Sequence, residues 1–181
     1  MISQYNMQKN FEKKKLHKKL IFFQELYWKK EAKNLENNNL NILDEVNKGA
    51  TMGMNAIKMV GDKTHDADLK STLKTEYEKY NKISERIHNL YSQITTDKEP
   101  HEVNKMEKMM TWYGIQMRTI TDDTPSKLSE LLMQGTNMGI IEGRRLLNHN
   151  QNTRVDESVK NILNDFVAMQ EDSVETLKKF L

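Results

Sequence analysis

The chain has 181 residues, and its 28 basic and 26 acidic side chains give a formal net charge of +2. That length suits one domain with its own core. With 7 glycines and 2 prolines, the chain has too few turn formers for an all-β protein, so we expect a mostly helical one. The absence of cysteine excludes disulfides, thiolate nucleophiles and Cys-ligated metal sites, and it favours a cytoplasmic location. No apolar run approaches the ~18 residues of a membrane span.

Charge is divided unevenly along the chain. Residues 1–38 hold nine lysines against four glutamates, a net charge of +5, whereas residues 39–181 hold 19 basic and 22 acidic side chains, a net charge of −3. We therefore predict two parts: a basic amphipathic N-terminal helix or extension over 1–38, and a helical bundle over 39–181.

Apolar residues recur at steps of three and four in five segments after the basic part, as they do in amphipathic helices. Polar runs that contain candidate caps separate the segments. Asp66 or Asp68 is the predicted N-cap of the second helix, Thr124 before Pro125 that of the fourth, and Thr153 opens a predicted capping box with Asp156. The five predicted helices cover residues 43–60, 69–94, 103–120, 125–149 and 153–181.

Helices of this length joined by short turns pack antiparallel to their neighbours, which predicts an all-α antiparallel bundle. The first, second, fourth and fifth helices would form a four-helix core, with the third as a crossover or cap. Four glycines fall at or beside the apolar faces of the helices, and there they predict close helix packing rather than turns. These are Gly49, Gly53, Gly135 and Gly139.

Several motifs resemble one known group of proteins. They are the segments 47–57, 69–73 with Tyr80, 112–117 and 132–140. In these segments the chain is similar to small, functionally uncharacterised ferritin-like helical-bundle proteins of Gram-positive spore-forming bacteria. The resemblance covers residues 40–181 and implies a ferritin-like four-helix bundle with an additional short helix, preceded here by the basic helix. The group carries no established activity, and its pattern often has a His where this chain has Lys127.

A ferritin-like fold raises the question of a di-iron centre. Such a centre needs a Glu from each of two helices and a Glu-x-x-His motif from each of the other two, all pointing inward. One such motif occurs, from Glu85 to His88, but Glu85 lies almost opposite the apolar face of its helix. The fifth helix has no His at all. The sequence therefore disfavours a complete ferritin-type centre.

Two carboxylates nevertheless fall on apolar faces. Glu76 lies one turn before Tyr80 on the second helix, and Glu142 lies two turns before His149 on the fourth. A carboxylate drawn into a core must be paired, hydrogen-bonded or bound to a metal. We interpret Glu76, Glu142 and His149 as candidate ligands of iron or manganese, and Tyr80 with Gln170 as a candidate ligand pocket.

The same residues also have structural explanations. Glu76 can pair with Lys79 or bond Tyr80, and Glu142 can pair with Arg145 one turn later. On those explanations neither carboxylate would bind a ligand, and no cofactor is expected.

The basic part repeats bulky apolar residues at helical spacing among its lysines. This pattern suits a helix that packs on the bundle or docks a protein partner, and it equally suits peripheral membrane contact through residues 10–30. Disorder is a further alternative, and nucleic-acid binding is disfavoured because this part has no Arg. The predicted membrane or partner surface comprises Lys13, Lys14, Lys15, Lys18, Lys19, Phe22, Phe23 and Trp28.

No catalytic constellation is found, neither a phosphate-binding glycine loop nor a Ser/His/Asp set. The sequence therefore predicts a non-enzymatic helical bundle with a structural or interaction role, engaging a protein partner or a second copy of itself. The alternative is a metal-binding ferritin-like oxidoreductase or metal store that uses iron or manganese.

Overall fold

A computed structural model describes residues 2–95, 114, 122–151 and 153–181, with side chains for residue 21 and from residue 24 onward. Every element within those ranges is a helix. They are α1 (Ile2–Lys63), α2 (Ala67–Ile94), α4 (Pro125–His149), α5 (Glu157–Leu177) and a short 3-10 helix, η1 (Lys178–Phe180). The predicted third helix, residues 103–120, lies outside the described residues apart from Gly114.

The chain divides into two compact units, Met1–Asn37 and Asn38–Leu181. The first unit consists of the N-terminal part of α1, and the second holds the rest of that helix with all the other elements. The predicted basic helix or extension of residues 1–38 and the predicted first bundle helix of residues 43–60 both fall within α1, which is one helix from Ile2 to Lys63. No Pro or Gly occurs in α1 before Gly49, so nothing in its first 47 positions breaks the backbone ladder.

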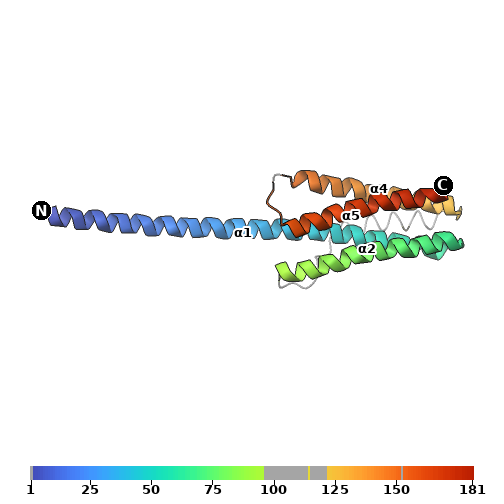
Figure 1. Cartoon of the computed structure of the whole chain (residues 1–181), viewed down its shortest axis with the longest axis horizontal. Coiled ribbons are helices and arrows are strands. Elements are labelled where there is room, and N and C mark those ends of the chain that lie inside the picture. The colour runs from blue at the N-terminus through green and yellow to red at the C-terminus, as the bar shows by residue number, and fades with distance from the viewer. Residues whose placement is uncertain (1, 96–113, 115–121, 152) are drawn as a thin grey trace. The chain divides into compact units, whose positions relative to one another are not determined.

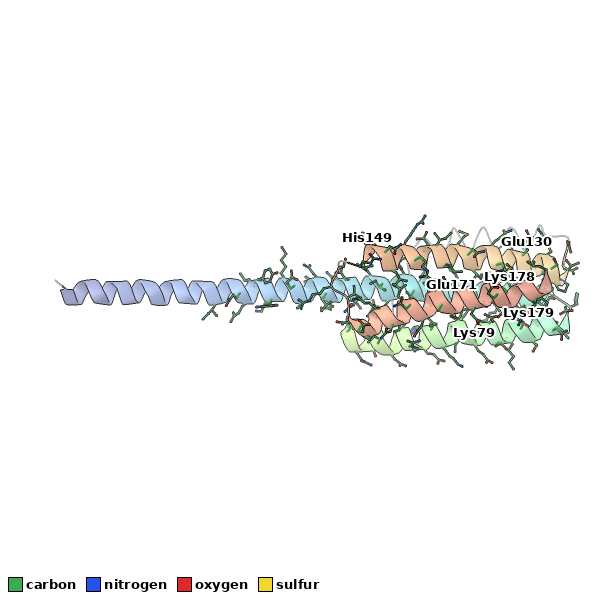
Figure 2. The ribbon with its side chains drawn as sticks, turned by 45° about the horizontal axis from the view of Figure 1, so that its top comes forward. Lys79, Glu130, His149, Glu171, Lys178 and Lys179 are labelled. Atoms are coloured by element: carbon green, nitrogen blue, oxygen red, sulfur yellow. The ribbon has the colours of Figure 1, made fainter. Side chains whose placement is uncertain are left out.

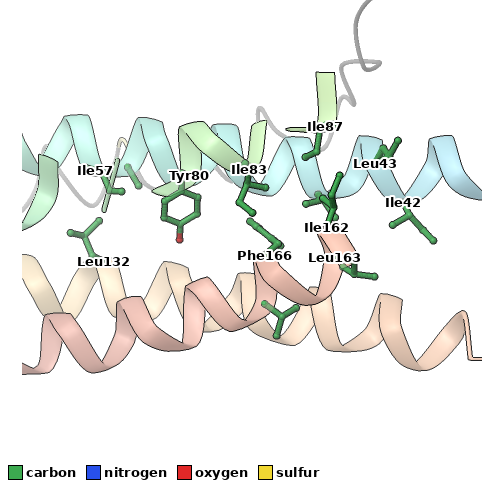
Figure 3. Close-up of a cluster of buried hydrophobic side chains, with 14 of the residues drawn as sticks. Ile42, Leu43, Ile57, Tyr80, Ile83, Ile87, Leu132, Ile162, Leu163 and Phe166 are labelled. Atoms are coloured by element: carbon green, nitrogen blue, oxygen red, sulfur yellow. The ribbon is translucent and has the colours of Figure 1, made fainter. Parts of the chain in front are cut away.

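The second unit is an antiparallel four-helix bundle, which confirms the predicted all-α fold. Its helices are the C-terminal part of α1 together with α2, α4 and α5, and α5 packs against both α2 and α4 (Figure 1). Apolar side chains from all four helices meet in one core (Figure 3). The most deeply buried of them, at 0–1% exposure, are Leu43, Val46, Ala50, Val60, Leu69, Ile87, Tyr91, Leu128, Val159 and Leu163.

Two of the predicted helix starts are confirmed. The Asp66 carboxylate accepts a 2.7 Å hydrogen bond from the backbone N–H of Leu69 at the start of α2. Thr124 caps α4 in the same way by accepting from Lys127, with Pro125 as the first helical residue. Both caps satisfy backbone donors that the first helical turn leaves without a partner.

The predicted start of the last helix is wrong by a few residues. We expected a capping box that opens at Thr153, but α5 begins at Glu157 with Asp156 as its N-cap, and that carboxylate caps no backbone N–H of its own helix. Asn39 of α1, which is 1% exposed, instead holds Asp156 from another helix. A contact 117 residues away in the sequence thus decides where α5 starts.

Candidate functional site

A partly open cavity of about 80 Å³ lies between the helices of the second unit. All four helices contribute to its wall. Most of the lining is apolar or glycine, and the polar side chains that reach it come from α2, α4 and α5. Those polar residues are Glu76, Tyr80, Thr136, Gln170 and Ser173.

Glu76 is the charged residue of this lining, and only 2% of it is exposed. One carboxylate oxygen accepts a hydrogen bond from the Ser173 hydroxyl on α5, and the other accepts from Lys79 Nζ at 2.7 Å. Burying a carboxylate is costly unless it is paired and hydrogen-bonded. Both conditions are met here, so the fold retains a charged group in its interior.

Lys79 connects this buried carboxylate to the protein surface. Its Nζ lies 2.7 Å from Glu76 and also 2.7 Å from Asp172 on α5, whose side chain is 66% exposed. Partial burial lowers the pKa of Lys79, but hydrogen bonds to Asp172 and Glu76, together with their negative charges, outweigh it and raise the pKa above its usual value. The ammonium group is therefore held firmly in its charged form. Figure 2 labels Lys79 on α2.

Tyr80 lies one turn after Glu76 and is 3% exposed. Its hydroxyl interacts with Gln170 and Thr136, and its ring meets Phe166 edge-on at 6.4 Å between centroids (Figure 3). Burial raises the pKa of the Tyr80 phenol, and hydrogen bonding to Gln170 and Thr136 only partly offsets that effect. The structure thus brings together Tyr80 and Gln170, the two residues of the predicted ligand pocket.

Gln170 is 3% exposed, and its Oε1 atom has no hydrogen-bond partner among the described residues. Its amide lies directly on the backbone of Gly139. A Cβ atom at Gly139 would come within 2.2 Å of Gln170 Nε2, so a residue with a side chain cannot occupy that position without displacing the amide. Gln170 Oε1 is therefore an unpaired acceptor that is packed away from water beside Gly139.

Glycines of α1 make the same kind of room for the aromatic side chains. A Cβ at Gly53 would lie 2.4 Å from Tyr80 Cε1, and one at Gly49 would lie 2.8 Å from Phe166 Cζ. This agrees with the prediction that these glycines serve close packing rather than turns. Without them the rings of Tyr80 and Phe166 could not lie against α1.

The structure does not bring Glu142 and His149 to the cavity. The Glu142 side chain is 66% exposed and pairs with Arg145 on the surface of α4, and His149 is an exposed residue at the end of that helix (Figure 2). Of the three candidate metal ligands only Glu76 faces the interior. The apolar face on which Glu142 was predicted to lie therefore needs correction, because α4 buries Thr136 and Gly143, whereas Met138, which was predicted on that face, is 43% exposed.

The Glu-x-x-His pair does not form a metal site either. Glu85 is exposed and accepts a hydrogen bond from Asn81, while His88 Nδ1 lies 2.7 Å from the backbone oxygen of Ser84. Within the part of the chain that the structure describes, no group of three or more His, Cys, Asp or Glu side chains is arranged to hold a metal ion.

Sequence reasoning did not select Ser173, Thr136 and Asp172 for this site. Ser173 lies three residues after Gln170, on the same face of α5, so helical spacing from a residue already chosen would have found it. Thr136 is one turn after Leu132, whose backbone oxygen it bonds at 2.9 Å. Nothing in the sequence marked Asp172, because its ion pair with Lys79 forms only when α2 lies beside α5.

For the predicted membrane or partner surface, Trp28 is the residue whose side chain is described, and it is 61% exposed. The side chains of Lys13, Lys14, Lys15, Lys18, Lys19, Phe22 and Phe23 lie outside the described part. Among the described residues, no helix combines the length and apolar character needed to cross a bilayer.

Comparison with known proteins bears on the fold. No protein-family model matches the sequence. A search of curated proteins finds no match either. Among solved structures, the chain is similar to a dodecameric thioferritin, the bacterioferritin-related protein of Bacteroides fragilis, with a TM-score of 0.62 and 13% sequence identity. The likeness covers 84% of this chain and 92% of that one, so the fold is ferritin-like.

This likeness corrects the expected function. We predicted a non-enzymatic bundle with a structural or interaction role in an unknown process, and the ferritin-like neighbour contradicts that reading.

Proposed function

We propose that this chain is a ferritin-like metal-binding protein that takes up iron or manganese, as a metal store or as the cofactor of an oxidoreductase. The observation that carries the proposal is Glu76, a carboxylate buried beside a cavity in the interior of a ferritin-like bundle. Interior carboxylates on facing helices are the means by which ferritin-like bundles hold metal ions.

Glu76 and Ser173 offer oxygen donors, which suit a hard divalent cation, although the Lys79 ammonium group lies 2.7 Å from the Glu76 carboxylate and would have to move away from it. Glu76 and the Ser173 hydroxyl would hold the ion, since they already meet across α2 and α5. A site with one buried carboxylate suits a single cation. A di-iron centre would need carboxylates from several helices. When bound, iron or manganese would supply redox chemistry or be the stored cargo.

Lys79 occupies the cation position of Glu76 in the described structure. It also pairs with Asp172, so the ammonium group keeps one carboxylate partner if a metal ion takes the other. We therefore expect metal binding to weaken the Lys79–Glu76 contact while the Lys79–Asp172 contact remains.

Other predictions made from the sequence accompany this proposal. One is that the chain forms a homo-oligomer, and the dodecameric assembly of the Bacteroides fragilis protein supports it by analogy. Four further predictions stay untested. They are a location in the cytoplasm, membership in the group of spore-former proteins, the division of the chain into residues 1–38 and 39–181, and the partner or membrane role of the basic part.

The test is equilibrium binding of Mn²⁺, and of Fe²⁺ without oxygen, to the full chain after treatment with a chelator. We expect one ion per chain for the wild type and loss of that binding in Glu76→Gln, which removes the charge and keeps the shape. The matched control is Glu142→Gln, which removes a surface carboxylate from an equivalent contact with a basic residue three positions later and should bind as the wild type does. Wild-type protein that binds neither ion, or binding unchanged by Glu76→Gln, would contradict the proposal.

A further inference from the structure

The cavity between the helices of the second unit has room for a small molecule. Its volume of about 80 Å³ exceeds the roughly 10–15 Å³ that one water molecule requires on such a measure. An engineered cavity of about 150 Å³ in another protein binds benzene, which has six carbon atoms. A molecule of about three or four non-hydrogen atoms is therefore the size that suits this cavity.

The apolar side chains of the wall come from all four helices. They are Met52, Ala56 and Ile57 of α1, Leu73 of α2, Leu132 and Met138 of α4, and Leu177 of α5. A molecule inside the cavity would therefore meet mostly hydrocarbon surface. Transfer of apolar surface from water into such surroundings is favourable, so the wall favours an apolar occupant.

The polar side chains of the wall are already engaged within the bundle. The Ser173 hydroxyl donates to the Glu76 carboxylate, and the Tyr80 hydroxyl interacts with Gln170 and Thr136. The remaining acceptor, Gln170 Oε1, is packed away from water. A polar group of an occupant would therefore lose its water without gaining a free partner among these residues, and this disfavours polar molecules.

The cavity opens to solvent between α1 and α4. Its lining residues on α2 and α5 are all buried, and a buried residue cannot border an opening. The lining residues that keep contact with solvent belong to the other two helices; they are Gly49, Met52, Gly53, Gly135, Met138 and Gly139. The two methionines have long, unbranched side chains that can adapt their conformation. A small molecule can thus enter when these side chains move aside, without separation of the helices.

We propose that this cavity binds a small, neutral, apolar molecule of the size of a short hydrocarbon, which enters between α1 and α4. The apolar wall provides the affinity, and the engaged polar side chains select against molecules that need a hydrogen-bond partner. Binding of this kind does not depend on a metal ion at Glu76. Measured on metal-free protein, its success or failure is separate from that of the proposed function.

Isobutene and acetone provide a matched pair of probes. Both are neutral and have the same branched shape, but acetone has a carbonyl oxygen where isobutene has a CH₂ group. We expect the chelator-treated full chain to bind isobutene saturably and roughly tenfold more tightly than acetone, because the acetone oxygen would lose its water without compensation. Two-dimensional NMR of methyl groups would follow both titrations. Failure to bind isobutene, or equal affinity for acetone, would overturn the proposal.

The variant that locates the site is Ala56→Leu, which adds bulk at a buried position of the wall. We expect roughly tenfold weaker isobutene binding in this variant, because the larger side chain takes up space and makes the cavity costly to occupy. The matched control is Ala168→Leu, the same change at an exposed position of α5, which should bind as the wild type does. Isobutene binding that is unchanged in Ala56→Leu would place the site elsewhere and refute the assignment.

If Ala56→Leu does not fold, wild-type methyl signals decide. The signals of Ile57 and Leu132, which line the cavity, should shift with isobutene. Those of Val159, a core residue near the start of α5 that does not line it, should stay still. Equal shifts at all three residues would refute the assignment.

Discussion

Asn39 of α1 makes two hydrogen bonds to Asp156 at the start of α5, one to its side chain and one to its backbone. Its Nδ2 atom donates a 2.6 Å hydrogen bond to the Asp156 carboxylate, and its Oδ1 atom accepts a 3.0 Å bond from the Asp156 backbone N–H. The side chain of Asn39 is almost fully buried, so its amide depends on these two bonds, whereas Asp156 is exposed to water. A helix start fixed from another helix in this way should be sensitive to a single substitution.

We expect Asn39→Ala to lower the free energy of unfolding by about 2 kcal/mol, because it removes two hydrogen bonds, one of them to a charged carboxylate. Urea denaturation of the full chain would measure the change. Asn161→Ala, at an exposed position of α5, is the control and should stay within about 0.5 kcal/mol of the wild type. Equal effects of the two changes would show that the contact with Asp156 contributes nothing.

Two glycines of α1 should respond in opposite directions to the same substitution. Gly53→Ala would place a methyl group 2.4 Å from the Tyr80 ring, and forced repacking of this kind costs about 1–3 kcal/mol. Among the described residues Gly61→Ala would meet Leu73 alone, at 3.9 Å, and it should stabilise the helix by about 0.5–1 kcal/mol. Thermal unfolding of both variants would measure the difference. Stabilisation by both changes would contradict the close approach of α1 and Tyr80.

Removing one partner of the Glu76–Lys79 pair should lower the free energy of unfolding far more than replacing both partners with apolar residues. Lys79→Met leaves a buried carboxylate with the Ser173 hydroxyl as its recorded partner, and we expect a loss of about 1–3 kcal/mol. Adding Glu76→Leu to Lys79→Met should recover most of this loss, because no buried charge then remains. A double-mutant cycle from urea denaturation would test this, and additive losses would contradict it.

Stability should fall in alkali because of Tyr80 and Lys79. Folding raises the pKa of both groups, so the folded state holds both protons more tightly than the unfolded state does. Their contribution is complete below the unfolded values, near 10, and is lost as pH rises through the folded values. Urea midpoints should therefore fall above pH ~10.

Tyr80→Phe isolates one of these two groups. This variant lacks the phenolic proton, so we expect its stability to fall less steeply above pH ~10 than that of the wild type. Tyr27→Phe, at a position that is 59% exposed, is the control and should follow the wild type. Identical slopes for Tyr80→Phe and the wild type would show that the buried phenol does not contribute.

The amino-acid sequence by itself determined the class of fold and the approximate limits of α2 and α4. Scarce Gly and Pro, three- and four-residue apolar spacing and the caps at Asp66 and Thr124 are local properties, and local properties are readable without a structure. The burial of Glu76, one turn before Tyr80 on a strongly periodic helix, follows from the same spacing.

Only the tertiary structure decided which side chains meet. Glu142 is exposed because α4 buries Gly143 and Thr136, small residues that hydropathy patterns underweight, while Ile141 faces outward. Similarly, the start of α5 depends on Asn39. Such contacts join residues far apart in the chain, and their energy comes from the fit between the surfaces of two helices. The spacing of residues within one helix does not predict that fit.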